Sequence, residues 1–125
     1  MSKILIIEDD SFLSGLIVGK FMKLGFEVDS ALDGESGLNK IVSNKYDAVL
    51  LDMILPKIDG FKILEEVKKN PSLKDLLIIV ASNLYDKNDI DKAVSLGAKD
   101  YIIKAYNSPE NIVDKVKLFL QKNNK

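Results

Sequence analysis

The stretch KILIIEDD, residues 3–10, decides the fold of this chain. Its four consecutive apolar residues have the length of a strand that is buried on both faces, which is typical of parallel sheets. The same pattern, a short apolar run that ends in an acid, returns as AVLLD at residues 48–52. Further runs predict two more buried strands and a weaker, alternating strand that suits a sheet edge, at residues 76–81, 101–103 and 26–31.

Segments with helical periodicity lie between these runs. In three of them apolar residues recur at i, i+3 and i+4, as in a helix with one buried face; they are Leu13, Leu16, Ile17, Phe21 and Leu24, then Ile63, Leu64 and Val67, then Ile112, Val113, Val116, Phe119 and Leu120. Gly25 and Gly97 stand where a glycine typically ends a helix. Ser108-Pro109-Glu110 provides an N-cap, a proline and an acid for the last helix.

Strand and helix therefore alternate five times, which predicts an α/β fold with a parallel five-stranded sheet and helices on both faces, a doubly wound (βα)5 arrangement. A chain of 125 residues has the length of one domain. We expect residues 1–125 to form that domain, with no room for an effector domain within them. The apolar run at residues 4–7 is too short for a signal peptide, and no run approaches a membrane span. The sequence thus predicts a soluble, cytoplasmic protein without a membrane partner.

The composition excludes several classes of chemistry. The chain contains neither His nor Cys, so it has no Ser-His-Asp triad, no His-ligated zinc ion and no thiolate nucleophile. Its 18 basic residues are all lysines, and the formal charge is −1. Arginine is the residue best suited to bidentate recognition of bases and phosphates, so we expect no direct binding of nucleic acid.

Acidic and polar side chains follow the predicted strands. Glu8 and Asp9 come after the first strand, Asp52 after the third, Ser82 after the fourth and Lys104 after the fifth. The carboxyl ends of parallel strands meet at one edge of an open α/β sheet, which is where such sheets bind ligands. We therefore expect these groups to converge on one crevice.

Carboxylates this close repel one another unless a cation lies between them. Oxygen ligands without His or Cys favour Mg²⁺, or Mn²⁺ in its place, and Mg²⁺ takes one or two carboxylates and keeps several waters. Glu8, Asp9 and Asp52 carry three negative charges, which one divalent ion and Lys104 would neutralise. Single acids at strand ends are more often helix N-caps, and we predict that role for Asp10.

The order and spacing of these groups resemble a response-regulator receiver domain of the free-standing, single-domain type. The resemblance rests on segments that span nearly the whole chain: Ile4–Asp9, Asp52 with Leu55-Pro56 and Asp59-Gly60, Ser82, and Gly97-Ala98-Lys99-Asp100-Tyr101 followed by Lys104. It implies a flavodoxin-like strand order of 2-1-3-4-5 and a function in two-component phosphorelay signalling.

The resemblance also implies a role for each site residue. Asp52 would accept the phosphoryl group, Ser82 and Lys104 would bind phosphoryl oxygens, and Tyr101 would be an aromatic switch. The implied ligands of Mg²⁺ are oxygen atoms at the strand ends: Glu8 through water, Asp9, Asp52 and the backbone carbonyl of Ile54.

The expected reaction is an in-line attack of the Asp52 carboxylate on the phosphorus of a phosphohistidine, which a histidine kinase or phosphotransfer protein would carry. Because this chain has no His, we expect the donor to be another protein or a small phosphodonor. Phosphorylation would draw the Ser82 loop inward, and Tyr101 would fill the vacated space. A downstream partner, which the sequence does not identify, would bind the changed face. The chain would catalyse only its own phosphotransfer and dephosphorylation, as a monomer or weak dimer.

The chain departs from the family pattern at two positions. Lys104 is followed by Ala105, where the family usually has a proline after a cis bond, and Ser82 is followed by Asn83, where a small residue is usual. A cis bond before a residue other than proline costs roughly 2.5–4 kcal/mol, so we expect either a trans bond or a strained turn after Lys104.

A second apolar row lies on the first predicted helix. Phe12, Gly15, Gly19 and Met22 follow i, i+3, i+4 spacing, and Val18 lies beside them. Such a low apolar stripe suits docking on the helical bundle of a histidine kinase, or a contact between two copies of the chain. Additional burial in the core explains the same pattern equally well.

Two other functions fit parts of the sequence. A degenerate receiver would dock partners and take no phosphoryl group. A phosphatase or phosphotransferase of the dehalogenase type also uses an aspartate nucleophile and Mg²⁺, but it requires Asp-x-Asp where this chain has Glu8-Asp9-Asp10. A P-loop is a poor match, because the segment Gly15–Lys20 has one residue too few between its glycines.

Overall fold

The computed structural model describes residues 2–123 of the chain. Its centre is a parallel sheet in the predicted order β2-β1-β3-β4-β5. The strands are β1 (Lys3–Ile7), β2 (Glu27–Ala31), β3 (Ala48–Leu51), β4 (Leu77–Ser82) and β5 (Asp100–Ile103). The helices are α1 (Ser11–Lys23), α2 (Gly34–Ser43), α3 (Gly60–Lys69), α4 (Lys87–Ser95) and α5 (Pro109–Asn123), with two 3₁₀ turns, η1 (Pro71–Leu73) and η2 (Lys104–Tyr106). The doubly wound α/β fold is confirmed.

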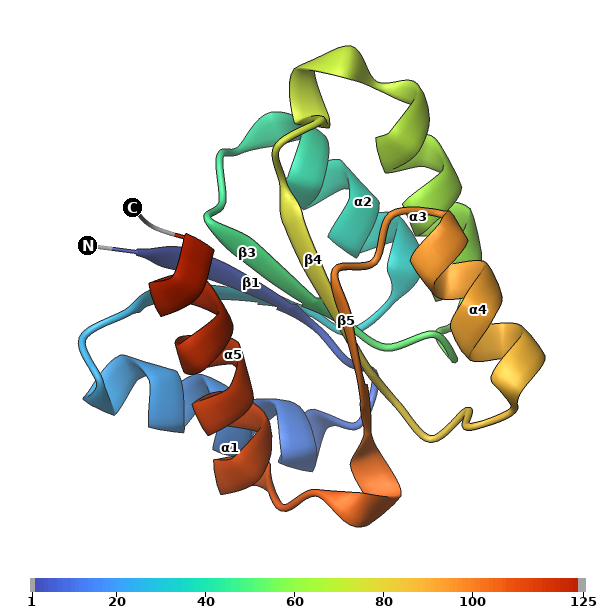
Figure 1. The fold of residues 1–125 in the computed structure, drawn as a ribbon. Coiled ribbons are helices and arrows are strands. Elements are labelled where there is room, and N and C mark those ends of the chain that lie inside the picture. The colour runs from blue at the N-terminus through green and yellow to red at the C-terminus, as the bar shows by residue number, and fades with distance from the viewer. Residues whose placement is uncertain (1, 124–125) are drawn as a thin grey trace.

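Helices α1 and α5 cover one face of the sheet, and α2, α3 and α4 cover the other (Figure 1). Alternate residues of each strand supply the two cores. In β1, Ile4 and Ile6 pack with α1 and α5, whereas Leu5 and Ile7 pack with the helices of the opposite face. All four side chains are buried, which is why this strand has a continuous apolar sequence.

Two kinds of predicted helix boundary are confirmed. Gly25 and Gly97 follow α1 and α4 with φ angles of 92° and 110°, the left-handed conformation that glycine adopts without steric strain from a Cβ atom. Asp10 Oδ1 accepts hydrogen bonds from the N–H groups of Phe12 and Leu13. Asp10 is therefore the N-cap of α1, as predicted, and it starts the helix directly after the acidic segment that ends β1.

The buried face of α1 differs in part from the prediction. Ile17 and Phe21 are buried, but Leu16 and Leu24 are 39% and 47% exposed, so the prediction was wrong for these two leucines. Ser14 is buried instead. The reason is geometric: at about 100° per residue Leu16 lies on the opposite side of the helix from Ser14, and Leu24 follows the last helical turn.

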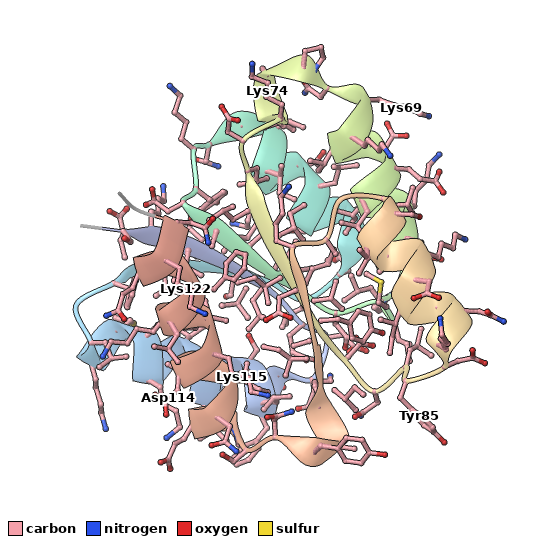
Figure 2. All side chains as sticks on the ribbon, in the orientation of Figure 1. Lys69, Lys74, Tyr85, Asp114, Lys115 and Lys122 are labelled. Carbon is pink, nitrogen blue, oxygen red and sulfur yellow. The ribbon has the colours of Figure 1, made fainter. Side chains whose placement is uncertain are left out.

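Charged side chains cover the outer face of α5. Asp114, Lys115 and Lys122 are exposed on this helix (Figure 2), and the two lysines line a hollow beside β5. Ile112, Val113, Val116 and Leu120 face the core beside α1, whereas Leu118 is exposed. None of the helices within residues 2–123 has the length and apolar character needed to cross a membrane.

Gly34 is a position where the fold requires the absence of a side chain. A Cβ atom at this residue would overlap the backbone oxygen of Ile58, in the loop between β3 and α3. We expect Gly34→Ala to lower the free energy of unfolding by about 1–3 kcal/mol, because the loop or α2 must shift to make room. Urea unfolding measures this change.

Gly15→Ala is the matched control. Gly15 lies within α1, and a Cβ atom there would meet no atom within 4 Å. Alanine in a helix interior is about 0.5–1 kcal/mol more favourable than glycine, so this variant is expected to be more stable than the wild type. A Gly34→Ala variant that is stabilised to the same extent would contradict the close contact with Ile58.

Candidate functional site

The predicted acids meet at the carboxyl end of the sheet. Glu8 and Asp9 directly follow β1, and Asp52 directly follows β3, the neighbouring strand in the sheet. One carboxylate oxygen from each of the three residues lies within 4.8 Å of the other two. Glu8 and Asp52 are buried, whereas Asp9 is exposed. The three acids therefore form one cluster that opens to solvent through Asp9.

Lys104 reaches this cluster from the far side of β4. Its Nζ lies 2.7 Å from Glu8 Oε1 and 2.9 Å from Asp52 Oδ2, and its side chain is only 12% exposed. A buried charge is tolerated when it is paired and hydrogen-bonded. Here the Lys104 ammonium group offsets one of the two negative charges of Glu8 and Asp52. The contact with Asp52 follows the sequence prediction, but the contact with Glu8 was missed. The sequence shows only that Glu8 follows β1 and Lys104 follows β5. These positions do not indicate which acid the lysine contacts.

Burial and neighbouring charges shift the pKa values of Glu8 and Lys104. Burial raises the pKa of Glu8, although hydrogen bonds from Lys104 and from the N–H of Asp10 act in the opposite direction. Burial by itself would lower the pKa of Lys104, but the hydrogen bonds to Glu8 and Asp52 outweigh it and raise that pKa. Lys104 therefore stays a cation at neutral pH. With three carboxylates and one ammonium group, the cluster has a formal charge of −2.

The donor set of the cluster fits a divalent cation. All its donors are oxygen atoms, its formal charge is negative, and the exposed side chain of Asp9 leaves room for water ligands. These are the properties of Mg²⁺ sites. The Ile54 N–H donates to Asp52 Oδ1 over 3.2 Å, which holds the loop that carries the predicted carbonyl ligand beside the acids.

The predicted switch residues Ser82 and Tyr101 contact the same loop, between β4 and α4. Ser82 is fully buried, and its Oγ accepts a hydrogen bond of 3.3 Å from the N–H of Leu84. The Tyr101 hydroxyl donates to the carbonyl of Leu84 over 2.7 Å, and burial raises its pKa. The next residue, Tyr85, points to solvent (Figure 2). Leu84 therefore links the two switch residues through its backbone.

The chain turns after Lys104 without a cis bond. Every peptide bond within residues 2–123 is trans, and the turn from Lys104 to Tyr106 is the 3₁₀ turn η2. Lys104 therefore meets Asp52 from a trans turn, which is one of the two geometries expected for a chain with Ala105 in this position.

The second apolar row of α1 is open to solvent. Phe12 and Met22 are 76% and 60% exposed, and a Cβ atom at Gly15 or Gly19 would meet no atom within 4 Å. Val18 is partly buried and packs against the core. Core burial therefore explains Val18 and leaves Phe12, Gly15 and Met22 exposed, with Gly19 partly buried between them.

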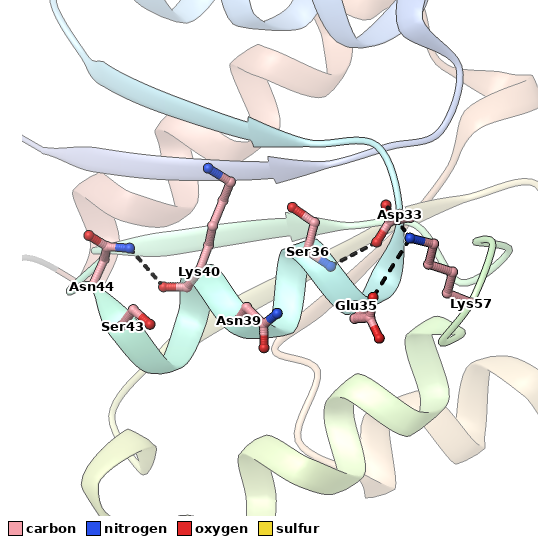
Figure 3. Close-up of a pocket in the computed structure, with 8 residues that line it drawn as sticks. All are labelled: Asp33, Glu35, Ser36, Asn39, Lys40, Ser43, Asn44 and Lys57. Atoms are coloured by element: carbon pink, nitrogen blue, oxygen red, sulfur yellow. Dashed lines mark hydrogen bonds and ion pairs between the residues drawn. The ribbon is translucent and has the colours of Figure 1, made fainter.

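A separate shallow hollow of about 380 Å³ lies along α2 (Figure 3). It is lined by polar and charged side chains: Asp33, Glu35, Ser36, Asn39, Lys40, Ser43, Asn44 and Lys57. Lys57 Nζ lies 3.9 Å from Asp33 and 3.7 Å from Glu35, and Asp33 also accepts from the N–H of Ser36 as the N-cap of α2. The ion pairs of this hollow lie at the surface, whereas the cluster at the end of the sheet has two buried carboxylates and a third acid close enough to share a metal ion. The cluster is therefore the candidate site.

Residues 4–117 match the response regulator receiver domain family. The response regulator ArlR of Staphylococcus saprophyticus is 37% identical over 110 residues, which are 88% of this chain and 49% of that protein. The chain spans about half the length of the curated relatives it matches.

Solved structures show the same fold. A two-component response regulator from Clostridium difficile is 31% identical, with a TM-score of 0.87 over the full length of both chains. The response regulator protein TrrA from Thermotoga maritima, in complex with Mg²⁺-BeF, is 30% identical, with a TM-score of 0.79 over 98% of each chain. The family match over residues 4–117 agrees with the strand order of the sheet and with the cluster of acids and its lysine. The chain therefore belongs to the family of response regulator receiver domains, which act in two-component signalling.

Proposed function

We propose that residues 1–125 act in the cytoplasm as one phosphoacceptor domain of a phosphorelay, in which Asp52 takes a phosphoryl group from a phosphohistidine. The position of Lys104 carries this proposal, because its Nζ lies 2.9 Å from the Asp52 carboxylate beside the oxygen ligands of Glu8 and Asp9. A carboxylate nucleophile, a cation aimed at it and adjacent metal-binding oxygens are the groups that phosphoryl transfer to a carboxylate requires.

The proposed cofactor is Mg²⁺, with Mn²⁺ as a substitute. Asp9, Asp52 and the Ile54 carbonyl would hold it, with Glu8 acting through water. The oxygen-only donors and the negative charge of the cluster support this, as does the complex of TrrA with Mg²⁺-BeF. When bound, the ion would neutralise charge on the phosphoryl oxygens.

In the proposed reaction an oxygen of Asp52 attacks the phosphorus atom in line. The new O–P bond forms as the P–N bond to the donor imidazole breaks, and the nitrogen of the donor keeps the electron pair. Lys104 exchanges its contact with the carboxylate for one with a phosphoryl oxygen. The donor is a histidine kinase or phosphotransfer protein, and its phosphohistidine lies outside residues 1–125, which contain no His. The domain catalyses only this transfer and its own dephosphorylation.

The proposed switch acts through the backbone of Leu84. The Ser82 hydroxyl, which now accepts from the Leu84 N–H, would donate to a phosphoryl oxygen and draw the β4–α4 loop inward. Tyr101 is bonded to the carbonyl of the same residue, so a movement of the loop reaches β5. A downstream protein would distinguish the two packings of α4, β5 and α5.

Intact mass after incubation with acetyl phosphate tests this function. We expect the chain to gain one phosphoryl group in the presence of Mg²⁺ and none after chelation of the metal. A degenerate receiver would gain none in either condition, and a phosphatase of the dehalogenase type would instead turn over a small phosphoester such as p-nitrophenyl phosphate. Either of these results would contradict the proposal.

The lifetime of the phosphoryl group depends on side chains near the site. Ile54 and Leu84 stand two residues after Asp52 and Ser82 and are expected to line the approach of a hydrolytic water. Apolar groups neither orient water nor accept its proton, so we expect a long-lived phospho-Asp52. Replacing Ile54 with Asn and Leu84 with Glu is expected to speed dephosphorylation by about tenfold or more.

The decay of the phosphorylated mass after removal of acetyl phosphate measures this rate. Val42→Asn is the control, because Val42 is an exposed apolar residue on α2, and its substitution is expected to leave the decay unchanged. The same decay in the wild type and in the Ile54 and Leu84 variant would reject a role for these two residues.

We further propose that Phe12, Gly15, Gly19 and Met22 form a docking surface for the helical bundle of the histidine kinase, beside the core residue Val18. Phe12, Gly15 and Met22 are exposed and Gly19 is partly buried, so the four residues form a low apolar row at the surface. A second copy of the chain is the alternative occupant, in a weak dimer.

Phe12→Lys tests the docking surface. We expect it to preserve labelling by acetyl phosphate, which needs no protein contact, and to slow transfer from the cognate kinase by about tenfold, because a buried aromatic anchor is lost from the interface. Val42→Lys places the same charge on an exposed apolar position of α2 and is expected to change neither rate. Equal kinase transfer in the wild type and Phe12→Lys would reject the docking role.

A further inference from the structure

Asn107 is hydrogen-bonded to both peptide groups that flank Lys104. Its side-chain Nδ2 donates to the carbonyl of Ile103 over 2.8 Å, and its backbone N–H donates to the carbonyl of Lys104 over 3.2 Å. These two carbonyls belong to the peptide bonds before and after the Lys104 Cα atom. Together they set the direction in which the lysine side chain leaves the backbone.

Few other contacts hold this turn. Ala105 and Tyr106 are exposed, and Ile103, at the N-cap position of η2, makes no side-chain capping bond. Ala105 also lacks the ring by which a proline would fix its φ angle. A 3₁₀ turn of three residues has poor hydrogen-bond geometry of its own. Besides the pairing of Ile103 with Ser82 in the sheet and the contacts of the Lys104 Nζ atom, the two bonds from Asn107 fix the backbone around Lys104.

Asn107 is not needed to start α5. Ser108 fills that role, because its Oγ accepts from the N–H of Asn111 over 3.1 Å and its carbonyl accepts from the N–H of Ile112 over 3.0 Å. The two neighbouring polar residues thus serve different elements. Ser108 caps the helix, and the half-buried Asn107 holds the turn that carries Lys104.

Lys104 must reach two acceptors at once. Its Nζ contacts Glu8 and Asp52 at the same time, at 2.7 and 2.9 Å, and four rotatable bonds separate this atom from the backbone. We propose that Asn107 is a positioning residue that directs Lys104 to Asp52 in a turn that has no proline. The effect of this role on phosphoryl transfer rests on the proposed function of Asp52. The contact of Lys104 with the two acids is independent of that function.

A double-mutant cycle of Asn107→Ala and Lys104→Ala tests the proposal through the side chain of Asn107. The Asn107→Ala substitution removes the bond to the Ile103 carbonyl and keeps the backbone N–H that donates to the Lys104 carbonyl. We expect Asn107→Ala to slow labelling by acetyl phosphate by about tenfold, since a small misplacement of a catalytic group has an effect of this order. In the Lys104→Ala background the same substitution is expected to change the rate by less than about twofold. Mg²⁺ affinity is expected to be unchanged by Asn107→Ala, because Asn107 does not contact the acids.

Asn44→Ala is the matched control. Asn44 follows α2 in the same extended conformation as Asn107, and both its N–H and its Nδ2 donate to the Lys40 carbonyl over 3.1 Å. It lies before β3, at the opposite end of the sheet from the acids. We expect this variant to label at the wild-type rate. A slowing equal to that of Asn107→Ala would show a general effect of stability and overturn the proposal.

The cycle separates this proposal from the proposed function. If the wild type is labelled, an equal fold-change from Asn107→Ala in both backgrounds, or no change in either, overturns the positioning role. If the wild type takes no phosphoryl group, the function of Asp52 is rejected, and the urea midpoints of the same four proteins decide the role of Asn107. If Asn107→Ala lowers the urea midpoint more in the wild-type background than in the Lys104→Ala background, the positioning role is supported. Equal shifts in the two backgrounds overturn it.

Discussion

Asp52→Asn is expected to abolish phosphoryl uptake, with a loss of about 10³-fold or more in the rate of labelling by acetyl phosphate. The amide has nearly the shape of the carboxylate but is a far weaker nucleophile. It also removes one of the charges that attract the metal and Lys104. The Asn oxygen still accepts a hydrogen bond, so the variant is expected to fold, and circular dichroism checks that it does.

Asp59→Asn provides the control for this loss. Asp59 lies in the same loop as Asp52 and caps α3 by accepting from the N–H of Lys62 over 2.9 Å. Asn is an equally good N-cap, so the variant removes a carboxylate from the loop without changing its structure. We expect Asp59→Asn to be labelled at the wild-type rate. Labelling of Asp52→Asn at the same rate as Asp59→Asn would reject Asp52 as the acceptor.

Lys104→Ala is expected to have the second largest effect. Its ammonium group is the cation seated between the two buried carboxylates of Glu8 and Asp52, so its removal is expected to lower the free energy of unfolding by about 3 kcal/mol in metal-free solution. The chain is expected to remain folded and to keep much of its Mg²⁺ affinity, because the three acids are unchanged.

The same variant is expected to lose the coupling between phosphorylation and the rearrangement around Ser82 and Tyr101. Amide NMR shifts in α4 and β5, compared before and after phosphorylation, measure this coupling. Lys99→Ala, at an exposed lysine before β5, serves as the control and is expected to behave as the wild type. If the shifts in Lys104→Ala move as far as in the wild type, Lys104 is not the coupling residue.

The fold was predictable because its sheet is parallel and covered on both faces. The bounds of β1 and β3, Lys3–Ile7 and Ala48–Leu51, match the predicted runs, since a strand buried on both sides is apolar at every position. The start of β2 and of β5 differs from the prediction by one residue, and β4 is shifted by one residue at both ends. There the ends depend on pairing with a neighbour, which the apolar pattern does not specify.

The meeting of the acids was predictable from topology, since parallel strands end at one edge of the sheet. The detailed contacts were not. Lys104 contacts Glu8 as well as Asp52, and this choice depends on the sheet twist and on the rotamer of a long side chain. The role of Asn107 was missed because it arises from the path of the turn after Lys104, and Ala105 does not restrict that path as a proline would.

The location of the phosphoryl group tests the central claim most directly. Acyl phosphates are reduced by borohydride, so treatment of the Mg²⁺-labelled wild-type chain, followed by proteolysis and peptide mass mapping, marks the residue that was phosphorylated. We predict a single modified position, Asp52. Modification of Glu8, Asp9 or any other residue in place of Asp52 would contradict the account.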